Sequence, residues 1–360
     1  MDLALIGLAS SGKTTLLKAL AAGHLPHGGS PNEPAVAVVK VPDERLDKLA
    51  ALVQAKKTTY LEMRIFDFPS FSVGKKGPPP QLLGALSTND LLVHVVRAHG
   101  DAAVPHPLGS VDPARDIAAM DLELVLADLG IVERRIDRLT TEMRSLPAGA
   151  RGAQEREMAL LQRLKAALEA EKPLRSAGVT AEERSLLGGF NLLTLKPMLI
   201  VLNIDEADAG RAGEIEGEYA DAAGQNAAVI ALAAKAEADV AELGPEEAAE
   251  FRKELGLPGE PAAARVLRAA VSLLGLVTFF TAGEKDAHAW SVPAGTTAVK
   301  AAGRIHSDIE RGFIRAEVIG WQELLEAGSH AEARKRGRLR LEGKTYEVQD
   351  GDVINVLFNV

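Results

Sequence analysis

Short apolar runs alternate with helix-like amphipathic segments from the start of the chain to about residue 270. The runs that predict strands cover residues 2–6, 35–41, 58–66, 91–97, 198–202 and 229–234. The run at 91–97 is almost continuously apolar, which is typical of a strand buried on both faces. This alternation predicts an α/β fold with a mostly parallel sheet that helices cover on both faces.

A different period governs the middle of the chain. Apolar residues alternate steps of three and four at Leu122, Val125, Leu129, Val132, Ile136, Leu139, Met143 and Leu146. Residues 147–149 interrupt this heptad pattern, and a second series follows at Met158, Leu161, Leu164 and Leu168. The two series predict an antiparallel helical hairpin. It is either a docking arm or a stabilising insertion, and the sequence does not separate the two.

From residue 278 the pattern is that of a compact α+β unit. Strands are predicted at 278–282, 287–292, 338–341, 344–348 and 353–360, with a helix at 297–311. We therefore expect a first domain of residues 1–117 and 195–277, a helical insertion at 118–194 and a C-terminal domain at 278–360.

The loop after the first predicted strand fits the pattern G-x-x-x-x-G-K-[ST] through Gly7, Gly12, Lys13 and Thr14. The glycines allow a tight turn whose amide groups point at a phosphate, and the helix that follows presents its positive end to the same anion. Lys13 is the candidate catalytic cation for the β- and γ-phosphates. The predicted phosphate-binding residues are Ala9, Ser10, Ser11, Gly12, Lys13, Thr14 and Thr15.

Candidate Mg²⁺ ligands are the Thr14 hydroxyl and the Asp67 carboxylate. Asp67 ends a hydrophobic run soon after the phosphate loop, which is the Walker B arrangement. The alternative is an ordinary turn aspartate before Pro69. We favour the metal role because a phosphate loop requires such a partner.

Two loops are candidates for the nucleotide base. The run at 198–202 leads into Asn203, Ile204 and Glu206, where guanine-specific proteins carry an Asn-x-x-Asp pattern. Glu206 is one methylene longer than aspartate, which disturbs guanine pairing. Ala234 and Lys235, after the run at 229–234, would form the second base-side loop.

Composition narrows the classes further. The 360 residues are 47% apolar and 25% charged, as in ordinary globular proteins, and the net charge of −9 argues against a broad nucleic-acid-coating surface. There is no cysteine, and no apolar run approaches the roughly 20 residues that span a bilayer. We expect a cytoplasmic protein with no membrane or DNA partner. A basic cluster at 334–340 is either a solvated face or an RNA or phosphate contact, and His94 is expected to be a satisfied core histidine.

Several passages resemble the YchF subfamily of Obg-related P-loop NTPases. They lie at residues 41–47, 111–129, 193–197, 236–239, 278–283, 301–306, 312–317 and 349–360. The resemblance implies a Ras-like P-loop NTPase domain with an inserted α-helical coiled-coil hairpin and a C-terminal β-grasp (TGS) domain. It also implies ATP preferred over GTP, backbone contact with adenine near Ile204, and ribosome or ribosomal RNA binding, through the TGS domain and the hairpin, in the regulation of translation or stress.

The sequence departs from this family in the two switch regions. Pro31 stands where the family has a threonine that ligates Mg²⁺, and Ser70 replaces the glycine of the Asp-x-x-Gly motif that begins at Asp67. Two functional hypotheses follow. The first is a slow, Mg²⁺-dependent ATPase. The alternative is a non-hydrolysing nucleotide-bound scaffold, or a GTP-binding protein, that docks on the ribosome or RNA.

Overall fold

A computed structural model describes residues 1–22, 34–71, 79–101, 103–147 and 150–359. The chain divides into two compact units. Unit 1 comprises Met1–Val38 and Arg64–Val266, and unit 2 comprises Val39–Met63 and Leu267–Val360. Among the described residues, no helix is both long enough and apolar enough to cross a membrane.

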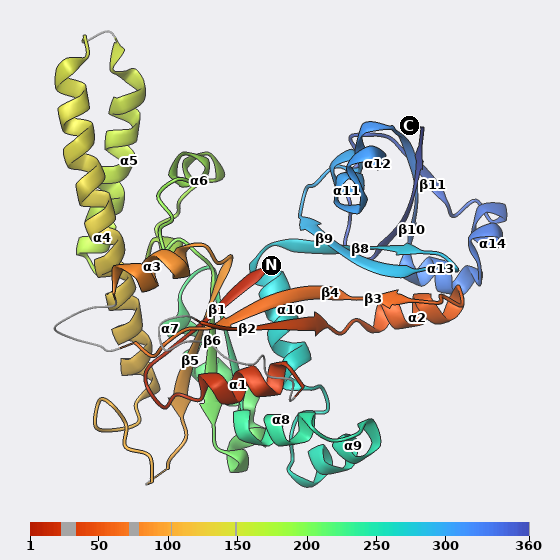
Figure 1. The fold of residues 1–360 in the computed structure, drawn as a ribbon, viewed down its shortest axis with the longest axis horizontal. Coiled ribbons are helices and arrows are strands. Elements are labelled where there is room, and N and C mark those ends of the chain that lie inside the picture. Colours follow the sequence, from red (N-terminus) through yellow and green to blue (C-terminus); the bar gives the residue numbers. More distant parts are fainter. Residues whose placement is uncertain (23–33, 72–78, 102, 148–149, 360) are drawn as a thin grey trace. The chain divides into compact units, whose positions relative to one another are not determined.

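The first sheet has six strands in the order β2-β4-β1-β5-β6-β7 (Figure 1). They are β1 (Asp2–Ile6), β2 (Ala35–Val41), β4 (Leu61–Asp67), β5 (Leu91–Ala98), β6 (Met198–Ile204) and β7 (Ala227–Leu232). Strands β4, β1, β5, β6 and β7 pair in parallel. Every residue of β6, and every residue of β5 except the last, is buried, which confirms the predicted central strands.

Successive residues of a strand point to opposite faces of a sheet, and apolar residues on both faces of this sheet are buried. Helices therefore cover both faces. On one face, Ile6 and Val96 share a core with Leu86, Met120 and Ala212 from three helices. The helices that connect or follow the strands of this sheet include α1 (Lys13–Leu20), α3 (Pro80–Ser87), α7 (Ala212–Ala223), α8 (Ala234–Ala241), α9 (Pro245–Glu254) and α10 (Ala262–Leu273), with a 3-10 turn η3 (Glu206–Arg211). This confirms the α/β fold class.

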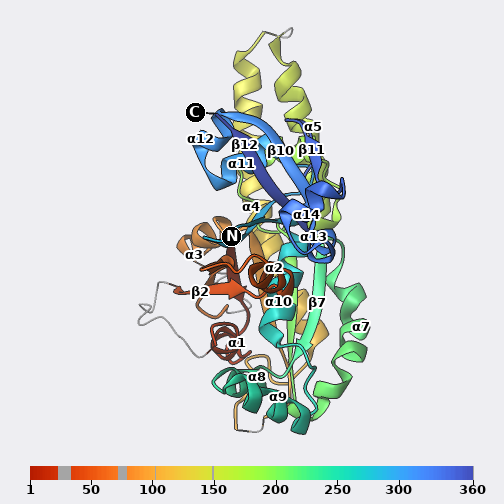
Figure 2. The same cartoon turned by 90° about the vertical axis from the view of Figure 1, so that its right-hand side faces the viewer.

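The predicted hairpin consists of α4 (Pro113–Ser145) and α5 (Gly152–Glu169), which lie side by side in both views (Figures 1 and 2). Its core contains the heptad residues Val125, Val132 and Leu139. Leu122, predicted to begin the seam, is instead 36% exposed. In the first turns of α4, Met120 and its neighbours face the sheet, so Leu122 faces away from the sheet. The chain returns through η2 (Leu174–Ser176) and α6 (Ala181–Leu187).

Unit 2 contains the second sheet, in the order β11-β10-β12-β8-β9-β3. Its strands are β3 (Thr58–Thr59), β8 (Leu276–Ala282), β9 (Ala287–Pro293), β10 (Phe313–Gly320), β11 (Arg340–Glu342) and β12 (Asp352–Phe358). The helices are α2 (Glu44–Leu52), α11 (Ala298–Ile305), α12 (Ser307–Arg311), α13 (Trp321–Ala327) and α14 (His330–Lys335). Phe279 and Phe280, adjacent on β8, are fully buried in two separate cores.

Three predicted elements differ in the structure. The strand expected at 58–66 is two strands, because β3 pairs with β9 while β4 pairs with β1. The helix expected at 297–311 breaks at His306, which has an extended backbone and accepts a hydrogen bond from the Asp308 amide at Nδ1. The strand expected at 344–348 is reduced to an isolated bridge between Thr297 and Glu347.

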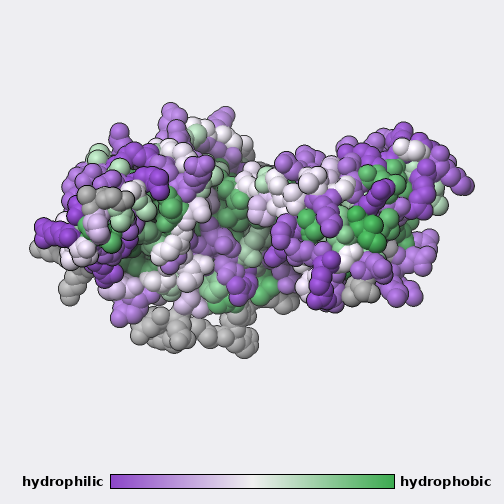
Figure 3. Space-filling view, turned by 90° about the horizontal axis from the view of Figure 1, so that it is seen from above, coloured by the Kyte–Doolittle hydropathy of each residue, from purple (hydrophilic) through white to green (hydrophobic). Residues whose placement is uncertain are grey.

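The surface seen in Figure 3 is largely hydrophilic, with hydrophobic side chains gathered in patches. Large exposed hydrophobic residues on the strands of unit 2 are Ile314, Leu341, Leu357 and Phe358.

Candidate functional site

The loop between β1 and α1 requires both of its motif glycines. Gly7 and Gly12 have positive φ angles of 155° and 97°. A Cβ atom on Gly7 would lie 2.5 Å from the carbonyl oxygen of Val95, and one on Gly12 would collide with the side-chain amide of Asn203. The loop is therefore held tightly against β5 and the end of β6, and side chains at these two positions would push it away.

Helix α1 begins directly after Gly12 with no side-chain cap and with no acidic residue in its first turn. Backbone N–H groups at the start of a helix lack partners within the helix and carry the positive end of its dipole. The first turn is therefore suited to an external anion, and this is where the predicted phosphate-binding residues lie.

Lys13 is buried beneath the loop that it follows. Its Nζ donates hydrogen bonds to the carbonyl oxygens of Gly7 at 3.2 Å and Leu8 at 3.3 Å, and to the Ser70 hydroxyl at 2.9 Å. Burial lowers the pKa of Lys13 to about 8, and the negative charge of Asp67 partly opposes this shift. The amine keeps its proton near neutral pH, although burial destabilises the charged form.

Thr14 and Asp67 meet because of the strand order. The register of β1 against β4 places Leu5 opposite Asp67, so the carboxylate emerges beside the loop. The Thr14 hydroxyl donates to Asp67 Oδ2 at 2.8 Å. The other oxygen, Oδ1, is shielded from solvent and has no hydrogen-bond partner among the described residues. These are the two predicted metal ligands, and the structure brings them together.

The segment after Asp67 is bound to the loop through its backbone. The amide of Phe68 donates to the carbonyl of Leu5 at 3.2 Å, and the amide of Phe71 donates to the carbonyl of Gly7 at 3.1 Å. Both phenylalanine rings are buried. Sequence reasoning identified Ser70 as a departure but missed its contact with Lys13, which depends on how this segment folds back. Pro31 lies outside the described residues.

Asn203 connects the phosphate loop to the start of α8. Its Nδ2 donates to the carbonyl of Ser11 at 3.1 Å, and its Oδ1 accepts from the amide of Ala234 at 3.1 Å. The side chain is 6% exposed. Ile204 is buried, whereas Glu206 and Lys235 are exposed. The predicted base-side residues thus begin at the phosphate loop and continue to the surface.

Asp205 is a neighbouring residue that sequence reasoning did not single out. Its Oδ2 accepts from the amide of Gly100 at 3.1 Å and so joins the ends of β5 and β6. The sequence signal that could have identified Asp205 is its position directly after a buried strand. Among the described residues, no group of three or more His, Asp or Glu side chains could hold a metal, which leaves the pair Thr14 and Asp67 as the candidate.

His94 lies in the core of β5, as expected, but it is not fully satisfied. Its Nε2 has no hydrogen-bond partner within the described ranges. Burial, together with the positive charges of Arg175 and Lys13, lowers the pKa of His94 to about 3. The ring is therefore neutral at physiological pH and is not a candidate proton donor.

The glycine loop, the buried lysine and the Thr14–Asp67 pair, set in a mostly parallel sheet, define a Ras-like P-loop NTPase fold with an inserted helical hairpin. The family model YchF-GTPase_C, described as "Protein of unknown function (DUF933)", matches residues 276–359. The chain is 41% identical to the "Ribosome-binding ATPase YchF" of Bacillus subtilis, over 99% of this chain and 98% of that protein. It belongs to the YchF family.

Two further relatives agree over the full length. The "Ribosome-binding ATPase YchF" of Escherichia coli O157:H7 is 38% identical, with 99% of this chain and 98% of that protein covered. A solved structure of the Schizosaccharomyces pombe YchF GTPase superposes with a TM-score of 0.85 and 25% identity, over 99% of this chain and 97% of that chain.

Proposed function

We propose that this protein binds purine nucleoside triphosphates with Mg²⁺, hydrolyses ATP slowly and associates with the ribosome in the cytoplasm. The observation that carries the nucleotide part is the convergence of the glycine loop, Lys13 and the Thr14–Asp67 pair at one edge of the sheet. The ribosome part is supported by the names of the bacterial relatives, which are called ribosome-binding ATPases. The hairpin and the C-terminal domain are the proposed contact regions.

In this proposal the chain acts mainly by positioning charge. The amides of residues 9–15 bind the phosphates, and Lys13 moves from its loop carbonyls to the β- and γ-phosphate oxygens, where it offsets negative charge that develops during transfer. Among the described residues we assign no general base, and the chemistry does not require one because positioning and electrostatics carry most phosphoryl transfer.

The residues present fit a magnesium ion. Asp67 Oδ1 is shielded and unpartnered within the described structure, and the Thr14 hydroxyl lies beside the other carboxylate oxygen. Oxygen donors of this kind are those that Mg²⁺ prefers, with substrate phosphates completing its shell. Bound there, the ion would supply positive charge to the phosphate oxygens.

The proposed base preference is ATP over GTP. The side-chain amide of Asn203 is hydrogen-bonded to the backbone of Ser11 and Ala234, so it supports the phosphate loop. We assign the adenine contact to the backbone near Ile204, with Glu206 and Lys235 flanking the base. The extra methylene of Glu206 works against the paired hydrogen bonds that guanine needs.

Ser70, in place of the glycine of the Asp-x-x-Gly motif, favours one alternative, a nucleotide-bound scaffold without turnover. Calorimetry with ATP, GTP and their non-hydrolysable analogues, with and without Mg²⁺, tests base and metal preference. Phosphate release that disappears in Lys13→Ala supports the ATPase. Tight ATP binding without release, together with co-sedimentation with ribosomes, identifies the scaffold instead. No affinity for any purine triphosphate would overturn both.

A further inference from the structure

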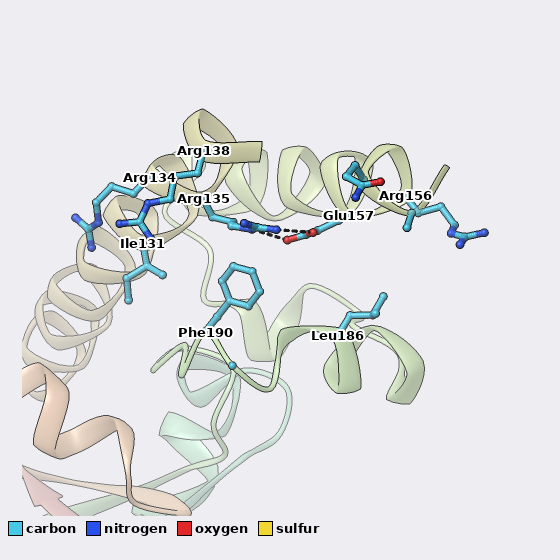
Figure 4. Close-up of a pocket in the computed structure, with 11 residues that line it drawn as sticks. Ile131, Arg134, Arg135, Arg138, Arg156, Glu157, Leu186 and Phe190 are labelled. Atoms are coloured by element: carbon cyan, nitrogen blue, oxygen red, sulfur yellow. Dashed lines mark hydrogen bonds and ion pairs between the residues drawn. The ribbon is translucent and has the colours of Figure 1, made fainter. Parts of the chain in front are cut away.

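A groove of about 660 Å³ lies within unit 1, between α4, α5 and the segment that includes α6 (Figure 4). One wall, formed by α6 and the residues after it, carries the apolar side chains of Leu186 and Phe190, and Ile131 of α4 adds a third apolar side chain from the opposite side. Leu186 is 64% exposed, although it is a large aliphatic side chain. In Figure 4 the ring of Phe190 points across the groove toward the opposite helices. The wall therefore offers a place for an apolar side chain from another molecule.

The other side of the groove is rich in arginine. Arg134, Arg138 and Arg156 are exposed and have no ion pair or hydrogen bond with any residue that the structure describes. Arg135 is different, because its guanidinium binds both oxygens of Glu157 at 2.7 and 2.8 Å. The one carboxylate in the lining is thus neutralised, and three positive charges are left without a partner in the described structure.

The most basic stretch of the sequence does not share this property. In the cluster at 334–340 the pairs are Arg334–Glu317, Lys335–Glu332, Arg336–Glu332, Arg338–Glu326 and Arg340–Asp352. This supports the interpretation of the cluster as a solvated, ion-paired face. Uncompensated charge is found instead on the hairpin, where arginines are spread along two helices.

A buried polar atom adds a second kind of incomplete contact. The side-chain oxygen of Gln154, which lines the groove, is shielded from solvent and has no hydrogen-bond partner among the described residues. A shielded oxygen of this kind costs stability unless a donor reaches it. A backbone N–H group of a peptide in the groove would be such a donor only if the Gln154 side chain turned toward the groove.

We propose that this groove binds an acidic peptide segment of a partner protein, with one apolar side chain inserted against Phe190 and Leu186. Carboxylates that flank the anchor would pair with Arg134, Arg138 and Arg156. The combination of an apolar wall and unpaired arginines is complementary to such a segment in both shape and charge. The proposal does not depend on nucleotide hydrolysis or on ribosome association.

A single-stranded RNA fits the groove less well. Non-specific RNA sites follow the strand along an extended basic groove with several stacking aromatic rings. Here the volume is compact, only Phe190 is aromatic among the lining residues, and Ile131 and Leu186 are aliphatic.

The test is selection from a random dodecapeptide library displayed on phage, with the full chain as the target. The expected peptides are rich in Asp and Glu around an aromatic or aliphatic residue. The strongest one, labelled with fluorescein, is then measured by fluorescence anisotropy. We expect R134E/R138E to lose about tenfold or more in affinity, and added salt to weaken binding to the parent chain.

Two further variants make the result specific. Phe190→Ala removes the anchor wall and is expected to cost about tenfold, with circular dichroism to check that the hairpin remains folded. The control R334E/R336E makes the same change in net charge at the paired cluster and should leave affinity within about twofold. Enrichment of non-acidic peptides, no enrichment, equal binding by R134E/R138E, or displacement of the peptide by a single-stranded oligouridine that binds more tightly would each overturn the proposal.

Discussion

The hydroxyl of Ser70 accepts a hydrogen bond from Lys13 Nζ at 2.9 Å. Ser70 lies three residues after Asp67, which itself accepts from Thr14. One short segment therefore holds both side chains that we assign to the triphosphate and its metal. A nucleotide must compete with Ser70 for the lysine, which makes this serine a candidate regulator of affinity.

Replacing Ser70 tests that competition. In Ser70→Ala, Lys13 loses one of its three acceptors, so less energy is needed to turn the amine toward a phosphate. A typical hydrogen bond contributes about 0.5–1.5 kcal/mol net, so ATP affinity should rise about two- to tenfold in calorimetry. Ser70→Thr keeps a hydroxyl and serves as the control. If the alanine and threonine variants bind ATP equally, Ser70 does not compete for Lys13.

The burial of Lys13 predicts a pH dependence of nucleotide binding. Its pKa falls from 10.5 to about 8 by burial, and a triphosphate favours the charged amine. ATP affinity should therefore fall as the pH rises above 8, approaching about tenfold per pH unit. Calorimetry between pH 7 and 9 in buffers of different ionisation enthalpy should show proton uptake on binding. Lys13→Met should abolish both effects, and a flat profile in the parent chain would refute the assignment.

The lowered pKa of Lys13 affects folding stability in the opposite direction, because stability should increase as the pH rises. Between about pH 8 and 10.5 the unfolded chain holds a proton on this lysine that the folded chain has released. The free energy of unfolding of the nucleotide-free protein should therefore gain a contribution as the pH rises through this window. Urea unfolding of the parent chain and of Lys13→Met should show this gain as a difference between their pH profiles.

The sequence was most informative where the signal is local. The phosphate loop, the central strands β5 and β6, and the hairpin follow from residue spacing and buried periodicity, because each is determined within a few turns of chain. The place of β3 could not be predicted this way. Thr58 and Thr59 are β-branched and come directly before β4 without a turn signal, yet they pair with Ala287 and His288 in another sheet.

The contacts of the candidate site show the same limit. Motif spacing indicated Lys13, Thr14, Asp67 and Asn203, since each residue type has a known place around a phosphate loop. It did not indicate the hydrogen bond of Ser70, which depends on the backbone contacts of Phe68 and its neighbours. The unpaired arginines on the hairpin could not be predicted from the sequence either, because the fold determines which charged side chains form ion pairs.

Asn203 is predicted to stabilise the phosphate loop as well as to support binding. Asn203→Ala leaves the carbonyl of Ser11 and the amide of Ala234 without their partner in a buried place. Leaving such groups unsatisfied costs about 1–3 kcal/mol, which urea unfolding should detect together with weaker ATP binding. The exposed Asn359, whose side chain has no hydrogen bond with the described residues, provides the control, since Asn359→Ala should change neither quantity. Unchanged stability in Asn203→Ala would show that the loop does not need this connection.

Glu206 gives the sharpest test of base preference, because it lies at the surface at the start of η3 and its replacement should not disturb the core. Glu206→Asp moves the carboxylate back by one methylene, to the length that guanine-specific loops use for the guanine N1–H and amino group. Hydrogen bonds to a charged group contribute about 1.5–3 kcal/mol, so the ratio of GTP to ATP affinity should rise about tenfold or more. Calorimetry with both nucleotides measures the ratio directly. Glu206→Gln, which removes the charge at constant length, should bring no gain for GTP. An unchanged ratio in Glu206→Asp would place the base elsewhere than beside Glu206.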